Sequence, residues 1–222
     1  MTNRTNFDRT LQSRFSGEIV TDYGIMDGNS TILLVKAGNG GSHRGYEDKY
    51  LHLADRINRA HGWTVFCASN PQNGDKTLEG AMQIVREYAA GRGFEKFQVY
   101  YMGFSDGALI GARCGADHPE IRRMVLVNGP LMMNWHRTKA GILRFFGESA
   151  TFVYGSLDPS YRYAELIQVL EKKIRGFTWK SRTDGIITSR KMGLTLRNWR
   201  SVICLRNACP IFAEIRLGIL VL

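Results

Sequence analysis

The sequence predicts an α/β fold, with a mainly parallel central sheet and helices on both faces. Between Thr31 and Lys173, short apolar runs alternate with segments of helical periodicity. Strands that alternate with helices form βαβ units, whose right-handed crossovers place the helices on the two faces of a parallel sheet. A glycine-rich loop follows the first apolar run, and Gly-Phe-Ser-Asp-Gly follows the third. These two loops carry the candidate functional residues.

Five short apolar runs have the length and composition of buried strands. Each is rich in β-branched or aromatic residues, and each leads into a loop that contains glycine or proline, which interrupt regular structure. In chain order, the predicted strands are Thr31–Lys36, Trp63–Ala68, Phe97–Met102, Arg123–Asn128 and Ala150–Tyr154.

The segments between these strands show apolar residues at helical spacing. In the first of them, Tyr50, Leu51, Ala54 and Ile57 lie on one helical face, as is typical of a helix that packs on a core. In chain order, the predicted helices are Glu47–Arg59, Thr77–Ala90, the segment from Gly107 to about Ala116, and Tyr161–Lys173.

The overall composition is that of a globular protein. The chain has 222 residues, of which 44% are apolar and 23% charged, and this excludes collagen-like, coiled-coil and wholly disordered chains. No apolar run reaches the ~18–20 residues of a membrane-spanning helix. Met1–Phe15 lacks the apolar core of a secretion signal, so we expect a cytoplasmic protein. The four cysteines have no paired spacing, so we expect neither a disulfide framework nor a zinc site.

The positive charge is concentrated at the C-terminal end of the chain. The formal net charge is +10, and residues 176–222 contribute eight Lys or Arg against two Asp or Glu. The first 175 residues are nearly balanced, with 22 basic and 18 acidic side chains. We therefore predict a domain over residues 1–175 followed by an atypical basic tail over 176–222. A nucleic-acid partner is not expected, because only the tail is basic.

The segment Gly103–Gly107 has the pattern Gly-x-Ser-x-Gly at the end of a predicted strand and the start of a predicted helix. This context is typical of a nucleophile elbow, in which a strained turn exposes a serine hydroxyl above the sheet. The glycines leave room where a side chain would clash with neighbouring chain. Ser105 is therefore the candidate nucleophile. The alternative is an ordinary turn in which Ser105 caps the helix.

The loop Gly38–Ser42 follows the first predicted strand and is a candidate oxyanion hole. Acyl transfer builds negative charge on the carbonyl oxygen, and loss of one preorganised N–H donor costs roughly 3–4 kcal/mol in a studied case. We expect the N–H of Asn39 or Gly40 to act together with that of Asp106, the residue after the serine. The alternative is a merely tight or phosphate-binding loop, although the spacing matches neither common phosphate motif.

Asp158 follows the last predicted strand, within Tyr-Gly-Ser-Leu-Asp-Pro. A carboxylate there orients a histidine and stabilises its imidazolium. The order of Ser105 before Asp158 is the one found in α/β-hydrolases. The alternative is a plain Asp-Pro turn.

With these motifs, the segment from about Glu18 to Lys173 resembles the small single-domain serine hydrolases of the α/β-hydrolase fold. The resemblance implies an esterase-like enzyme with a Ser-Asp-His triad that acts on a small-molecule ester or related acyl bond. It implies no metal or organic cofactor. The substrate does not carry over, because the fold supports many chemistries. The other interpretation is a non-catalytic binding protein of this fold, or a degenerate gene product.

The histidine expected after Asp158 is missing, since the chain has no histidine after His136. Two of the five histidines have positions from which they could approach Ser105. His43 lies beside the glycine loop, and His136 lies in the apolar segment 129–147, which forms either a substrate-binding lid or a packed connection. We expect the others, His52, His61 and His118, to be surface or packing residues.

A change of reading frame would explain the missing histidine. Asp184–Ser189 can be encoded by GAC GGG ATC ATC ACT TCA, and reading two bases later gives Arg-Asp-His-His-Phe. The hydrolases that this chain resembles carry such a run at the catalytic histidine. The shifted frame also permits a strand before this run, a Glu-rich helix after it and then a stop. We hypothesise that the chain is out of frame from about Gly176; the alternative is a true basic extension that contacts lipid or a partner.

Overall fold

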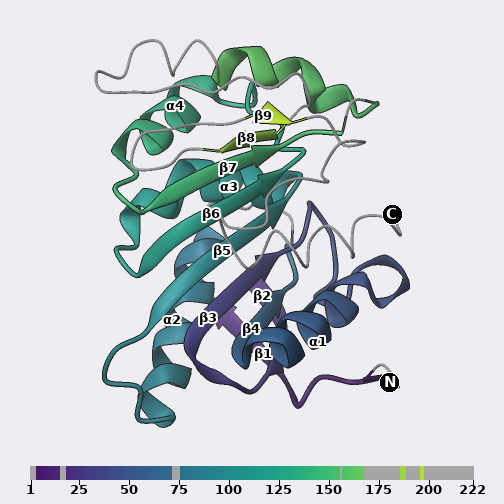
Figure 1. Ribbon diagram of the computed structural model, residues 1–222, viewed down its shortest axis with the longest axis vertical. Helices are drawn as coiled ribbons and strands as arrows, with labels where there is room; N and C mark the ends of the chain where they lie inside the picture. The colour runs from purple at the N-terminus through teal and green to yellow at the C-terminus, as the bar shows by residue number, and fades with distance from the viewer. Residues whose placement is uncertain are drawn as a thin grey trace. The chain divides into compact units, whose positions relative to one another are not determined.

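The structure is a computed structural model, and it describes residues 4–15, 19–71, 76–155, 157–167, 186–188 and 196–197 (Figure 1). The chain forms two compact units, and the division between them lies between Tyr100 and Tyr101. The strand β5 (Gln98–Phe104) crosses this division. The predicted boundary at residue 176 falls outside the described residues and stays a prediction.

The first unit contains four neighbouring strands in the order β1-β2-β4-β3. Only β3 and β4 are parallel, and the helix α1 (Lys49–His61) connects them, as the alternation of strands and helices predicts. The antiparallel hairpin β1–β2 was not predicted, because its outer strand is largely exposed and has no apolar run. The four strands are β1 (Arg9–Phe15), β2 (Ile19–Met26), β3 (Asn29–Lys36) and β4 (Trp63–Ala68).

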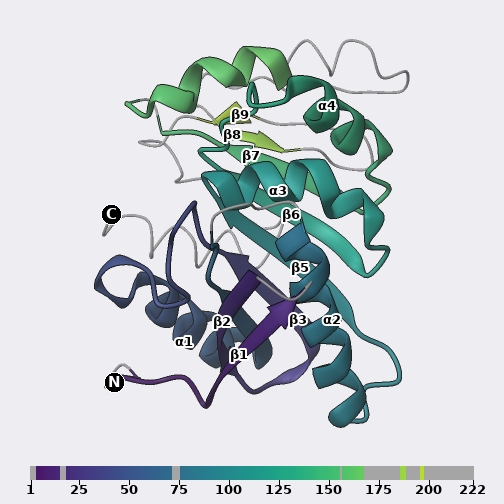
Figure 2. The same cartoon turned by 180° about the vertical axis from the view of Figure 1, so that it is seen from behind.

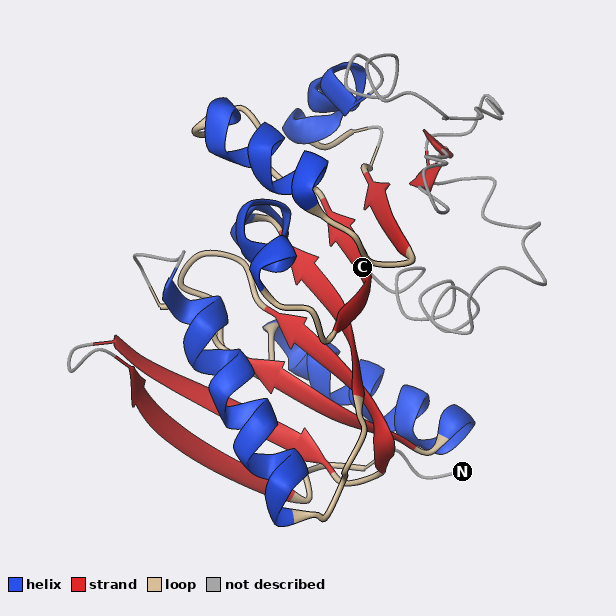
Figure 3. Ribbon diagram, turned by 90° about the vertical axis from the view of Figure 1, so that its left-hand side faces the viewer, coloured by secondary structure: helices blue, strands red, loops and turns tan. Residues whose placement is uncertain are grey.

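Two helices cover the opposite faces of these strands. The helix α1 lies in front of them in Figure 1, and α2 (Lys76–Gly91) lies in front in Figure 2, which is the view from behind. Figure 3 shows the same strands from the side, with a helix on either side of them. The strand β4 is consequently buried throughout and β3 from Ile32 onward, and both helices turn apolar side chains towards these strands.

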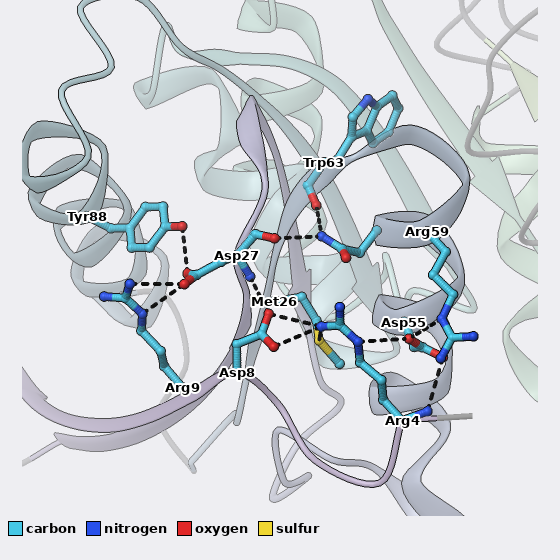
Figure 4. A network of polar contacts seen from close by, with 10 residues as sticks. Arg4, Asp8, Arg9, Met26, Asp27, Asp55, Arg59, Trp63 and Tyr88 are labelled. Carbon is cyan, nitrogen blue, oxygen red and sulfur yellow. Dashed lines mark hydrogen bonds and ion pairs between the residues drawn. The ribbon is translucent and has the colours of Figure 1, made fainter. Parts of the chain in front are cut away.

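A polar network joins the N-terminal segment to α1 and to the strand ends of the first unit (Figure 4). Asp55 of α1 is almost fully buried and forms ion pairs with Arg4 at 3.5 Å and Arg59 at 2.8 Å. Asp27 accepts hydrogen bonds from Tyr88 at 2.8 Å and Arg9 at 3.0 Å. These contacts tie elements far apart in sequence, so the network fixes the N-terminal segment and the first hairpin against the unit.

The second unit continues the alternation of strands and helices. The parallel pair β6 (Ile121–Val127) and β7 (Ser149–Val153) is joined through α4 (Trp135–Arg144). The helix α3 (Asp106–Cys114) packs against α4 and β6. The contact between the helices is close, because a Cβ at Gly141 of α4 would lie 2.3 Å from the carbonyl oxygen of Ala112. The segment 129–147 therefore contains a helix that packs against α3, and the choice between a lid and a packed connection stays open.

The C-terminal part of the second unit contains short elements. Asp158 caps the 3-10 helix Pro159–Tyr163, and helical residues continue to Ile167, the last described residue of the predicted helix Tyr161–Lys173. Within the predicted tail, β8 (Ile186–Thr188) pairs antiparallel with β7, and β9 (Leu196–Arg197) pairs with β8. In the described part of the chain, no helix is long and apolar enough to cross a membrane.

Candidate active site

Ser105 lies at a sharp turn between β5 and α3. The strand ends at Phe104 and the helix begins at Asp106, so a single residue makes the turn. Ser105 has φ 52° and ψ −115°, a combination that L-residues rarely adopt and that costs on the order of 1–3 kcal/mol. Such strain persists only where surrounding bonds impose it, and it is concentrated at functional sites. The strand–turn–helix context predicted for Ser105 is therefore present.

Backbone hydrogen bonds hold Ser105 on both sides of the turn. Its N–H donates to the carbonyl oxygen of Val127 at 2.8 Å, and its own carbonyl accepts from the N–H of Leu109 at 3.1 Å. The first bond fixes the turn to the carboxyl end of β6, and the second belongs to the first turn of α3. The position of Ser105 is thus set by two different elements of the second unit.

Close backbone packing explains the first glycine of the motif. A Cβ at Gly103 would lie 2.4 Å from the carbonyl oxygen of Gly107, so only glycine fits there without movement of the backbone. A similar approach occurs at Gly111, where a Cβ would lie 2.3 Å from the ring of Tyr101. Gly111 was not among the residues predicted to matter; its signal was a glycine inside a helical pattern, which often marks close packing.

The hydroxyl of Ser105 does not cap α3. Ser105 occupies the N-cap position, but its side chain makes no capping hydrogen bond, and the residue is exposed. The alternative interpretation, a serine that caps the helix, is therefore wrong. The Oγ atom lies at the N-terminus of α3, where the helix dipole favours negative charge. It forms no hydrogen bond with any residue that the structure describes.

Asp158 follows β7 and is held by its neighbour Ser160. Its Oδ1 atom accepts from the backbone N–H of Ser160 at 2.8 Å and from the hydroxyl at 2.6 Å. Asp158 thus forms the turn that the alternative interpretation proposed. Within the residues that the structure describes, Oδ2 has no hydrogen-bond partner. The turn therefore leaves one carboxylate oxygen available to orient a further group.

Asn128 connects the ends of β6 and β7, and no role was predicted for it from the sequence. Its Oδ1 atom accepts from the N–H of Gly155 at 2.9 Å, and its carbonyl accepts from the hydroxyl of Ser160 at 3.2 Å. Its φ of 50° is left-handed, which asparagine tolerates better than most residues. An asparagine before glycine at the end of a predicted strand was the available signal. Through Asn128 and the adjoining Val127, Asp158 and Ser105 are connected to the same strand end.

The candidate oxyanion loop Gly38–Ser42 belongs to the first unit. The N–H of Gly40 already donates to the carbonyl oxygen of Asn70 at 2.8 Å, and the N–H of Asn70 donates to Gly41 at 2.9 Å. Asn39 is exposed, and its N–H makes no hydrogen bond with a described residue. Of the two predicted donors in this loop, Asn39 is therefore the one that remains available. Asp106, the third predicted donor, is the first residue of α3.

The described histidines occupy very different environments. His43 is half-buried, and burial lowers the pKa of its imidazole, with smaller opposing and reinforcing effects from Asp22 and Arg44. His136 is exposed on α4, whereas His118 is buried. Of residues 184–189, where the shifted frame places histidines, the structure describes only Ile186–Thr188, which form the strand β8. Among the described residues, no three His, Cys, Asp or Glu side chains form a group that could hold a metal ion.

Comparison with known proteins supports the fold. No family model and no curated protein matches the chain. Est1E from Butyrivibrio proteoclasticus is 13% identical, with a TM-score of 0.56 over 75% of this chain and 85% of that one. An α/β serine hydrolase homologue from Coxiella burnetii is 12% identical, with a TM-score of 0.52 over 78% and 85%. Dienelactone hydrolase from Anabaena variabilis is 14% identical, with a TM-score of 0.51 over 75% and 82%.

These similarities show that the chain has the α/β-hydrolase fold, with its mainly parallel central sheet, as the motifs in the sequence predict. At this level of identity the likeness extends to the fold and not to the reaction. The roles of Ser105, Asp158, Asn39, Gly40 and Asp106 stay predictions.

Proposed function

We propose that this protein is a serine hydrolase that cleaves a carboxylic ester or related acyl bond of a small molecule, with Ser105 as nucleophile. The observation that carries the proposal is the strained backbone of Ser105 together with its exposed, uncapping hydroxyl. A strained serine between a strand and a helix is the arrangement that presents a nucleophile above an α/β-hydrolase sheet. A purely structural turn would gain nothing from strain of this size.

In the proposed reaction, Ser105 Oγ attacks the carbonyl carbon while its proton passes to a general base. The carbonyl oxygen becomes an oxyanion, which accepts a hydrogen bond from the N–H of Asp106, the residue after the nucleophile. The intermediate expels the alcohol, which takes up the proton, and leaves an acyl group on Ser105. Water then attacks the acyl group in the same manner, releases the acid and returns the proton to Ser105.

The general base in this scheme is a histidine that Asp158 Oδ2 orients, and the chain as written has none after Asp158. We propose that it lies in the other reading frame of the segment around Asp184–Ser189. Loss of the triad histidine costs about 10⁶ in turnover in the best-studied case. The chain as written is therefore expected to be a very slow hydrolase, whereas the frame-restored chain is expected to turn over.

The test compares both chains with a fluorophosphonate probe and with p-nitrophenyl esters. A frame-restored chain that labels and hydrolyses, and loses both properties on Ser105→Ala, supports the proposal. Ser13→Ala is the matched control, since it removes a serine hydroxyl from β1, a strand that carries none of the candidate site residues. A well-folded, frame-restored chain that neither labels nor hydrolyses would contradict the proposal.

The missing histidine favours a second candidate function, a non-catalytic protein of the same fold that binds a small molecule. Resequencing the gene across codons 170 to 206 separates the two candidates before any assay. A single-base correction returns the histidine and favours the enzyme, whereas DNA that encodes the chain as written favours the binding protein.

A further inference from the structure

Large apolar side chains are exposed beside the carboxyl ends of β6 and β7. Met132 and Met133 follow β6 and are 49% and 58% exposed. Leu157 and Tyr161 follow β7 and are 97% and 40% exposed. We call these four residues together with Arg137 and Lys139 the apolar–basic edge. It is a property of the second unit alone.

Hydrogen bonds fix the two loops of this edge beside each other. The loop after β6 begins with Asn128 and Gly129, which bond to Ser160 and to Tyr154 at 3.2 Å and 3.3 Å. Further along, the N–H of Met133 donates to the carbonyl of Pro130 at 3.0 Å, and Arg113 of α3 donates to the carbonyl of Met133. Hydrogen bonds therefore anchor the backbone of the loop that carries the two methionines. Their side chains are exposed even though this loop is anchored.

The charge of this segment has one sign. Residues 129–147 include Arg137, Lys139 and Arg144 and no Asp or Glu. Arg144, at the far end of α4, pairs with Asp117 at 3.0 Å. Arg137 and Lys139 lie in the first half of α4, which begins two residues after Met133. The part of the helix nearest the exposed methionines therefore carries two basic side chains and no acidic one, and Arg137 also has an interaction of its own.

Exposed apolar side chains flanked by cations match a surface that is apolar beneath a negatively charged layer. A membrane leaflet with anionic headgroups has this structure, and basic amphipathic segments bind it with the apolar side chains inserted at the headgroup boundary. Each Lys or Arg close to such a surface contributes to the attraction, which falls off within a Debye length. A protein partner would have to supply both an apolar pocket and anions.

We propose that the apolar–basic edge docks reversibly on an anionic lipid surface, with Met132 and Met133 inserted among the headgroups. This inference does not depend on the proposed hydrolase activity. Docking would bring Ser105 close to the lipid surface. The N–H of Ser105 donates to Val127 at the end of β6, so Ser105 lies on the same edge as the methionines. An ester within the membrane surface would reach Ser105 without leaving the lipid.

The experiment is co-sedimentation of the full chain with vesicles of phosphatidylcholine, with and without an equal amount of phosphatidylglycerol. The double variant Met132→Gln, Met133→Gln is expected to bind the anionic vesicles about tenfold more weakly, since it removes apolar groups from the inserted part. The matched control is Leu143→Gln, Phe146→Gln, which changes two exposed apolar residues at the other end of α4. The control is expected to stay within about twofold of the parent.

The charge is tested with Arg137→Gln, Lys139→Gln, which is expected to weaken binding to anionic vesicles and leave binding to pure phosphatidylcholine unchanged. The basic tail provides a competing explanation for vesicle binding. If the tail carries the binding, the methionine variant binds as well as the parent, and that result overturns the proposal. Absence of binding by the parent overturns it too. Ser105→Ala is expected to bind vesicles normally, so a failed hydrolase assay and a failed docking assay are distinguishable.

Discussion

The hydroxyl of Tyr101 donates a hydrogen bond of 2.5 Å to the carbonyl oxygen of Gly107, across the turn that carries Ser105. Tyr101 lies on β5 and is fully buried, and Gly107 belongs to the first turn of α3. Burial raises the pKa of Tyr101 well above its usual 10.0, and the nearby Cys114 and Asp106 raise it further. The hydroxyl therefore stays protonated and donates over the whole range of pH in which the protein is handled.

Tyr101→Phe is expected to destabilise the protein by about 1–3 kcal/mol, because the buried Gly107 carbonyl loses its donor. Urea unfolding of the parent and the variant measures the difference. The control is Tyr46→Phe, which removes a hydroxyl from a side chain that is 74% exposed, and its effect is expected to stay within about 0.5 kcal/mol. Equal stability of the Tyr101 variant and the parent would show that the turn does not need this bond.

Gly103→Ala is expected to destabilise the protein by at least about 2 kcal/mol, since overpacking against backbone has no flexible neighbour to yield. The added Cβ would meet the Gly107 carbonyl oxygen at 2.4 Å. Gly91→Ala is the matched control, because a Cβ there meets nothing within 4 Å. The midpoint of thermal unfolding gives the comparison. If both variants melt together, the close approach between the two glycines is not a constraint on the turn.

Asp55→Asn is expected to cost about 1–2 kcal/mol, because the amide cannot replace the charged acceptor for Arg4 and Arg59. Both arginines are more than a third exposed, and water compensates part of the loss. Denaturant unfolding measures the change. Glu79→Gln alters an exposed pair with Arg86 at 3.5 Å and is expected to change stability by less than about 0.5 kcal/mol. If the Asp55 variant is as stable as this control, the ion pairs of Asp55 do not contribute to the stability of the fold.

His43 is expected to make stability depend on pH near its ordinary pKa of 6.5. Burial lowers the pKa in the folded protein, so the unfolded chain takes up a proton at a higher pH than the folded one. The unfolded state then binds more protons, and stability falls as the pH drops below 6.5 and through the folded pKa. Above that window the contribution is fully present.

His43→Gln is the variant that checks this dependence. Its free energy of unfolding is expected to fall less than that of the parent when the pH is lowered from above to below 6.5. The two proteins share every other titrating group, so the difference between their pH profiles isolates His43. Parallel profiles across this window would mean that the imidazole titrates alike in the folded and unfolded states.

The predicted strands and helices between Thr31 and Ile167 correspond closely to the observed ones. The strand Trp63–Ala68 has the predicted bounds, and α1 lies within two residues of its expected start and end. Continuous apolar runs and helical spacing are strong local signals. A short apolar run is typical of a strand buried on both faces, and apolar residues at helical spacing are typical of a helix buried along one side. The hairpin β1–β2 and the helix α4 lack such signals, since much of β1 and α4 is exposed. Their formation depends on partners elsewhere in the unit.

The sequence alone determined most of the strands and helices between Thr31 and Ile167, the α/β-hydrolase resemblance and the candidate residues Ser105 and Asp158, because each rests on the local pattern of a few neighbouring residues. Tertiary structure decided what surrounds them. It gave Ser105 its strained backbone, tied it to Val127 at the end of β6, bonded Asp158 to Ser160 and Ser160 to Asn128 at the same strand end, and occupied the Gly40 N–H with Asn70. These features are pairings between residues far apart in the chain. Their geometry follows from packing and hydrogen bonding in three dimensions, which no local pattern of residues encodes.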